Sequence, residues 1–176
     1  MDDFLRRLLG GSSRKPHPLD DDSTGLPDAS AASNLPTPAP VQPKVLAIIH
    51  NPIIRPRGRQ RAQIAYRWND PDKLAWGYIS DLADASYGYL QYQIVERIEV
   101  DGFPLKQDGF RYTDETFDRA WNTRQFHQPD AVDYFALVRE FSLIERVDSG
   151  EIDEVWLLGF PYCGYYGSIM AGGGGV

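Results

Sequence analysis

The sequence has 176 residues, a formal net charge of −7 and a single cysteine. This length suits one domain, and the acidic balance argues against nucleic acid and anionic membranes as partners, because both bind basic surfaces. One cysteine permits no internal disulfide, and no apolar stretch approaches the roughly 20 residues of a transmembrane helix. The charged start of the chain does not resemble a signal peptide, so we expect a cytoplasmic protein without a transmembrane segment.

Residues 1–11 have the pattern of a short amphipathic helix. Its apolar side chains lie on one helical face and two arginines lie opposite: Phe4, Leu5, Leu8 and Leu9 against Arg6 and Arg7. Two interpretations remain open. Residues 4–9 dock on a partner, or they form a frayed turn, since about ten residues are marginal as an isolated helix.

Residues 12–43 predict a disordered linker. They contain seven prolines, many Ser, Ala and Asp residues and no aromatic side chain. Such a composition cannot bury enough apolar surface to offset the loss of chain entropy on folding. We therefore place the start of the folded domain at Lys44.

Two continuous apolar runs, at residues 45–49 and 155–158, predict strands that are buried on both faces. Alternation over residues 89–100 predicts another strand. Helical periodicity and N-cap residues predict helices at residues 71–85, about 113–122 and 129–146. The alternating order predicts an α/β fold with a small, mainly parallel sheet and crossover helices.

The predicted sheet is thin. Sheets usually have about four to six strands, and this chain stops at residues 172–176, directly after its last strand and loop. We therefore expect the α/β domain, residues 44–176, to be truncated at its C-terminus, with further strands downstream.

His50 and Asn51 follow the first apolar strand, and Cys163 follows the last. If these strands are parallel, the three residues share one edge of the sheet, where open α/β sheets place their ligands. A histidine can keep a cysteine as a nucleophilic thiolate, so they are candidate catalytic residues for acyl transfer. The alternative is a half-buried cysteine and a histidine satisfied by a loop carbonyl, because Pro161 and Tyr165 occupy the glycine positions of a nucleophile elbow.

An arginine-rich loop follows the first strand, with Arg55, Arg57 and Arg59 as candidate ligand-binding residues. Guanidinium groups match phosphate or carboxylate oxygens bidentately, so this loop is a candidate anion site. The alternative is a solvated loop, for which Asp70 and Asp72 offer internal partners.

The Gly/aromatic loop after the last strand contributes four further candidate ligand-binding residues, Tyr162, Tyr165, Tyr166 and Ser168. Tyrosines on a loop suit sugar or peptide binding through their flat faces, and we expect Tyr165 and Tyr166 at the surface. The glycines lack the spacing of a nucleotide-binding motif, and no Cys/His set has zinc spacing. The sequence predicts no cofactor and no metal.

One segment resembles a family of uncharacterised bacterial proteins. It runs Asp153-Glu154-Val155-Trp156, Gly159-Phe160-Pro161-Tyr162, Gly164-Tyr165-Tyr166-Gly167-Ser168 and Met170-Ala171-Gly172. The resemblance extends back through His50-Asn51-Pro52 and Asp133-Tyr134, so it covers residues 44 onward. In that family an acidic residue is common where this chain has Gly167, and the domain continues further. The resemblance implies a fold and supplies no activity.

Two hypotheses for function follow from these residues. The first is a hydrolase-like α/β enzyme with its site at the carboxyl edge of the sheet. The second is a binding module for a sugar, a peptide or a protein through the aromatic loop at residues 160–168. A concave pocket beside His50 with a titratable group of perturbed pKa favours the enzyme, whereas a flat aromatic surface favours the binding module.

Overall fold

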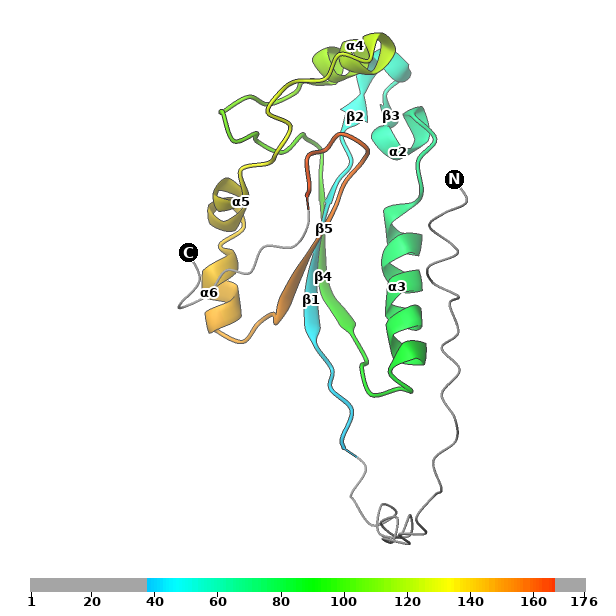
Figure 1. Cartoon of the computed structure of the whole chain (residues 1–176), viewed down its shortest axis with the longest axis vertical. Coiled ribbons are helices and arrows are strands. Elements are labelled where there is room, and N and C mark those ends of the chain that lie inside the picture. The colour runs from blue at the N-terminus through cyan, green and yellow to red at the C-terminus, as the bar shows by residue number, and fades with distance from the viewer. Residues whose placement is uncertain (1–37, 167–176) are drawn as a thin grey trace, which may run out of the picture. The chain divides into compact units, whose positions relative to one another are not determined.

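The computed structural model describes residues 38–166, which form a three-stranded parallel sheet with helices on both faces (Figure 1). The predicted docking segment at residues 4–9, most of the predicted linker and Ser168 lie outside the described residues. None of the helices in the described part of the chain is both long and apolar enough to cross a membrane.

The central strand is β1 (Lys44–His50), with β4 (Gln93–Val100) on one side and β5 (Glu154–Leu158) on the other. Both pairings are parallel, and the three strands end level with one another. Every residue of β1 after Lys44 is buried, which explains why this strand is apolar throughout rather than alternating. The predicted α/β class and the parallel, adjacent placement of the two apolar strands are confirmed.

One helix covers one face of the sheet. α3 (Pro71–Ala85) connects β1 to β4 and packs on the sheet face opposite α5 and α6 (Figure 1). It begins as predicted, because the Asp70 carboxylate accepts hydrogen bonds from the backbone N–H groups of Asp72 and Lys73, and Pro71 occupies the first helical position.

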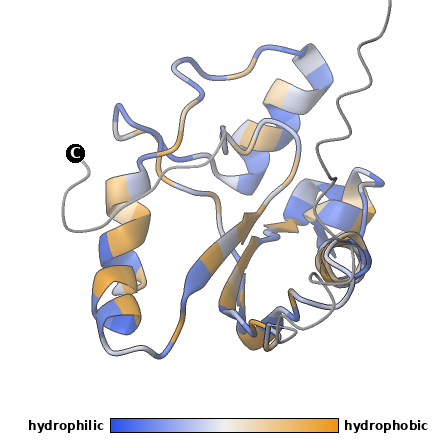
Figure 2. Ribbon diagram, turned by 60° about the horizontal axis from the view of Figure 1, so that its bottom comes forward, coloured by the Kyte–Doolittle hydropathy of each residue, from blue (hydrophilic) through white to orange (hydrophobic). Residues whose placement is uncertain are grey.

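Three helices lie between β4 and β5 in the chain: α4 (Asp114–Thr123), α5 (Tyr134–Glu140) and α6 (Leu143–Asp148). α5 and α6 cover the second face of the sheet, where Leu143 packs with Leu46 and Ile48 of β1 and with Ile152. Figure 2 shows the apolar colouring of the sheet and of the two helices where they meet. This cluster holds the β4–β5 crossover against the sheet.

The predicted helix at residues 129–146 is wrong in its bounds. It is two shorter helices, because Ser142 takes a left-handed conformation, with φ of 50°, between α5 and α6. The first of them starts at the N-cap Asp133, whose side chain accepts a hydrogen bond from Ala136 N–H. The strand predicted from residue 89 begins at Gln93. Ahead of it, Tyr89 and Gln91 form backbone hydrogen bonds with Val41, so the paired part of the chain begins before Lys44.

An aromatic cluster lies beyond the carboxyl ends of the strands. Four short elements surround it together with α4: β2 (Ile53–Ile54), η2 (Arg55–Arg57), β3 (Gln60–Arg61) and α2 (Ala62–Ala65). At its centre Phe117 is fully buried and meets Phe160, which follows β5, edge to face at 5.0 Å between ring centroids. This cluster fixes the loop after β5 against the segment that leads into α3.

Candidate functional site

The order of the strands creates a crevice at one end of the sheet. The chain passes from β1 to β4 on one side of the sheet and then to β5 on the other side of β1. Open α/β sheets bind ligands at such a switch point, beyond the carboxyl ends of the strands that diverge there. A pocket of about 230 Å³ lies at this place, between the ends of β1 and β5 and the start of α3.

No charged side chain lines this switch-point pocket among the described residues. The ends of β1 and β5 contribute Ile49, His50, Asn51, Leu158 and Gly159. The segment from α2 into α3 contributes Gln63, Trp68, Asn69 and Leu74. Amides, an imidazole, an indole, a phenyl ring and aliphatic groups therefore make the walls, in a chain of which 24% of the residues are charged.

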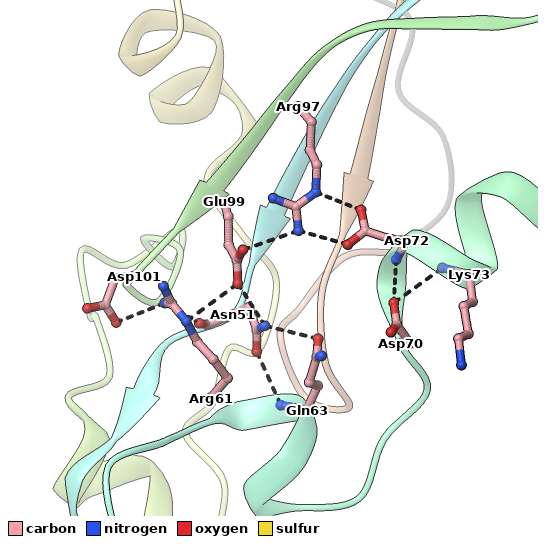
Figure 3. Close-up of polar contacts among 9 residues, drawn as sticks. All are labelled: Asn51, Arg61, Gln63, Asp70, Asp72, Lys73, Arg97, Glu99 and Asp101. Atoms are coloured by element: carbon pink, nitrogen blue, oxygen red, sulfur yellow. Dashed lines mark hydrogen bonds and ion pairs between the residues drawn. The ribbon is translucent and has the colours of Figure 1, made fainter.

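Asn51 connects the segments around the pocket by hydrogen bonds. Its amide Nδ2 donates hydrogen bonds to Gln63 Oε1 and Glu99 Oε1, each at 3.0 Å, and its Oδ1 accepts one from Gln63 N–H at 3.2 Å (Figure 3). These bonds join the end of β1 to α2 and to β4. Because they engage both ends of its amide, Asn51 positions other residues, and the Gln63 side chain is the more available ligand group.

The charged side chains next to the pocket form ion pairs with one another. Arg97 binds Asp72 through two hydrogen bonds of 2.6 and 2.9 Å and also contacts Glu99 (Figure 3). Arg61 donates to the backbone oxygen of Asn51 and lies 3.6 Å from Asp101. This network ties the first turn of α3 to β4, so the helix that carries Leu74 is fixed relative to the sheet.

His50 is neutral at physiological pH. It is only 3% exposed, and burial, with a smaller contribution from Arg111, lowers its pKa from 6.5 to about 4. Its Nδ1 lies 2.6 Å from the Tyr165 hydroxyl. Burial raises the pKa of Tyr165 well above its usual value, so the hydroxyl stays protonated. It donates a hydrogen bond to Nδ1 of His50. The imidazole proton then resides on Nε2.

Cys163 is buried beside the same tyrosine. Burial raises the pKa of its thiol to about 12, although the nearby Lys106 acts in the opposite direction. The Tyr165 hydroxyl bonds the ring of His50, and its nearness to the thiol acts, more weakly than burial, to lower the pKa of Cys163. At neutral pH Cys163 is a thiol and not a thiolate, and its predicted role as nucleophile stays a prediction.

A buried ion pair anchors the loop after β5. Lys106 is 1% exposed, and its Nζ donates to the Asp130 carboxylate at 2.7 Å, to the Asp130 carbonyl at 2.6 Å and to the Cys163 carbonyl at 2.8 Å. The second carboxylate oxygen of Asp130 accepts a hydrogen bond from the Tyr166 hydroxyl at 2.5 Å. Sequence reasoning missed this pair, because both residues lie in irregular segments that carry no motif.

Gly164 is the residue that lets this anchor form. Its φ is +95°, and a Cβ at this position would collide with the carbonyl oxygen of Asp130 and with Lys106 Nζ. We expect Gly164→Ala to lower the free energy of unfolding by about 1–3 kcal/mol, measured by urea denaturation. Gly109→Ala is the matched control, because Gly109 also has a positive φ but open space around it. Equal losses in the two variants would show that the contact with Lys106 and Asp130 is unimportant.

The predicted arginine site is not brought to the pocket. Arg55 pairs with Asp114 at 3.0 Å and Arg57 with Asp118 at 2.6 Å, which ties η2 to α4, while Arg59 is exposed. The predicted internal partners were wrong, since Asp70 caps α3 and Asp72 binds Arg97. Anion binding by these arginines stays a prediction.

The loop tyrosines are not equivalent. Tyr162 is 45% exposed and stacks on Phe126 with 3.7 Å between ring centroids, and Tyr166 is 60% exposed. Tyr165 is half-buried, so its predicted place at the surface is wrong. Its hydroxyl forms a hydrogen bond with the buried His50. Leu157, residues 159–166 and Asp130 line a second, open cavity of about 330 Å³, in which the Asp130 carboxylate is already engaged by Lys106 and Tyr166.

Comparison of the chain with models of protein families, with curated proteins and with solved structures finds no match. Within residues 38–166, no group of three or more His, Cys, Asp and Glu side chains is placed to hold a metal ion. The switch-point pocket and its chemistry are therefore the features that indicate a function.

Proposed function

We propose that this chain is a binding domain for a small, uncharged, polar ligand, and that the ligand occupies the switch-point pocket. The observation that carries the proposal is the absence of Asp, Glu, Lys and Arg from the described residues that line it. A charged ligand buried there would lack a counter-charge, and an unpaired buried charge is costly. An uncharged ligand with hydroxyl or amide groups would meet matching partners.

The lining specifies the ligand further. The side chains of Gln63 and Asn69 offer both donors and acceptors, and the indole of Trp68 offers a donor and apolar surface. The volume of about 230 Å³ is below the roughly 300–1,000 Å³ of pockets for drug-sized ligands. A single sugar ring, which combines hydroxyl groups with apolar C–H faces, fits this size and this chemistry.

A matched pair of variants on α3 tests the proposal. Leu74 and Trp76 are 52% and 59% exposed, and only Leu74 lines the pocket. We expect Leu74→Lys to weaken binding of a neutral monosaccharide by about tenfold or more, because it places a charge in the pocket, whereas Trp76→Lys binds like the original chain. Lysine is a good helix former, so both variants keep α3.

The measurement is a titration of the chain with glucose, galactose and N-acetylglucosamine, followed by amide NMR signals. The expected result is a shift of the signals of Asn69, Leu74 and Gly159 with one of these sugars, and weaker binding of the charged counterparts glucosamine and glucuronate. Preferential binding of a charged sugar, or shifts that avoid these three residues, would contradict the proposal.

A hydrolase-like enzyme is the second candidate function. It is favoured by one observation, that the neutral His50 lies in the lining of a concave pocket with a strongly lowered pKa. In this case the Nε2–H of His50 donates a hydrogen bond to a substrate oxygen, and Tyr165 orients the imidazole. Turnover of p-nitrophenyl acetate that falls by about 10²-fold in His50→Gln would support it, and turnover that does not change would exclude it.

We also propose that the protein is cytoplasmic and that it belongs to the bacterial family that its sequence resembles. The proposed family membership rests on the segment from Asp153 to Gly172.

A further inference from the structure

β5 lies at one edge of the three-stranded sheet. Among the described residues β5 pairs only with β1, so the backbone groups along its other side have no strand partner there. Its last four residues are half-buried and apolar on both faces of the sheet, and Figure 2 shows the apolar colouring over the carboxyl half of the strand. Val155 and Leu157 pack on the face of α6, and Trp156 meets Tyr78 of α3 on the other face.

The other edge of the same sheet is built differently. β4 carries Glu96, Arg97 and Glu99 along its length, and charged side chains are the usual means by which edge strands avoid pairing with other chains. β5 carries a charge only at its first residue, Glu154. An edge that is apolar and free of such charges is a template for another strand.

We propose that a second copy of this chain pairs with β5, strand against strand and antiparallel, across a two-fold axis. In the symmetric register Trp156 lies opposite Trp156 of the second copy, Val155 lies opposite Leu157, and Glu154 lies opposite Leu158. Apolar side chains therefore meet apolar side chains at the three central positions, as cross-strand pairing favours, and the Glu154–Leu158 pairs lie at the two ends of the interface. The two sheets join into one of six strands, close to the mean size of about five to six.

The distribution of charge along β5 favours antiparallel over parallel pairing of the two copies. Glu151, Asp153 and Glu154 gather at the start of β5, whereas residues 157–163 carry no charge. Antiparallel pairing sets the acidic start of each strand beside the uncharged end of the other. Parallel pairing would set the acidic ends side by side, which is destabilising.

Leu158 ends β5 and also lines the switch-point pocket. The inference does not depend on the proposed ligand, because it rests on the strand edge alone.

Light scattering of the full chain during size-exclusion chromatography tests the proposal. The chain has a mass of 19.9 kDa, and we expect twice this mass at about 100 µM, about 100-fold above a micromolar dissociation constant. Trp156→Lys places two like charges opposite each other on the axis and should raise the dissociation constant by about tenfold or more. Val95→Lys is the control, because Val95 is 47% exposed on β4, and it should keep the double mass.

A cysteine substitution tests the register and does not depend on the stability of the lysine variant. Residues directly opposite in antiparallel strands have Cβ atoms about 4.5–5.5 Å apart, so Trp156→Cys should form a disulfide with its counterpart under oxidation. Val95→Cys should not. A mass of 19.9 kDa for the original chain, which is that of one copy, or equal cross-linking of the two cysteine variants would overturn the proposal.

Discussion

Replacing Lys106 by methionine is expected to lower the free energy of unfolding by about 3–5 kcal/mol. The change removes one partner of a buried ion pair and leaves the Asp130 carboxylate, which is 8% exposed, without its counter-charge. It also removes the donor to the carbonyls of Asp130 and Cys163, so the loop after β5 loses its anchor. Urea denaturation followed by tryptophan fluorescence measures the loss.

Arg97→Met is the matched control for this prediction. Arg97 also pairs with an aspartate, but its side chain and that of Asp72 are 37% and 46% exposed, so we expect a loss of only about 0–1 kcal/mol. The double variant Lys106→Met with Asp130→Leu should recover part of the loss, because no unpaired charge then remains buried. If Lys106→Met cost no more than Arg97→Met, the Lys106–Asp130 pair would not anchor the loop.

The second large effect concerns pH. The pKa of His50 is about 4 in the folded chain and 6.5 when the histidine is exposed, so between these values the unfolded chain binds more protons than the folded one. Stability that is present above pH 6.5 is therefore lost as the pH falls toward 4. This single group accounts for about 3 kcal/mol of that loss.

His50→Gln isolates this contribution, because glutamine does not titrate. Urea denaturation of both chains at pH 7, 5.5 and 4 should show the free energy of unfolding falling by about 3 kcal/mol more in the original chain than in the variant. The comparison concerns the slope with pH, since the substitution also changes the stability at pH 7. Parallel slopes would mean that His50 is accessible to protons in the folded chain.

The fold was predictable where the sequence pattern is local. The continuous apolar runs at β1 and β5 predict strands that are buried on both faces, and the sheet confirms their parallel pairing. The sequence predicts that Asn69 or Asp70 caps α3 and that Thr113 or Asp114 caps α4, because a short polar side chain ahead of an apolar helical pattern satisfies the first backbone N–H groups. The structure has Asp70 and Thr113 in these roles. The edge that carries His50 and Asn51 follows from these elements.

The rest depends on contacts between distant residues. Lys106 and Asp130 are 24 residues apart and lie in segments without periodicity, so no local pattern indicates that they pair. The break at Ser142 is a single left-handed residue inside an apolar helical pattern. Trp68 and Leu74 belong to the connection between β1 and β4, and the packing of α3 on the sheet brings them to the same pocket as His50.

Intermolecular NOEs between a bound monosaccharide and the methyl groups of the chain test the central claim most directly. Leu74 and Leu158 both line the switch-point pocket, one on α3 and the other at the end of β5. A sugar ring in this pocket is predicted to give NOEs to the methyl groups of both residues. NOEs confined to Tyr162 and Tyr166, which line the second cavity, would contradict the claim.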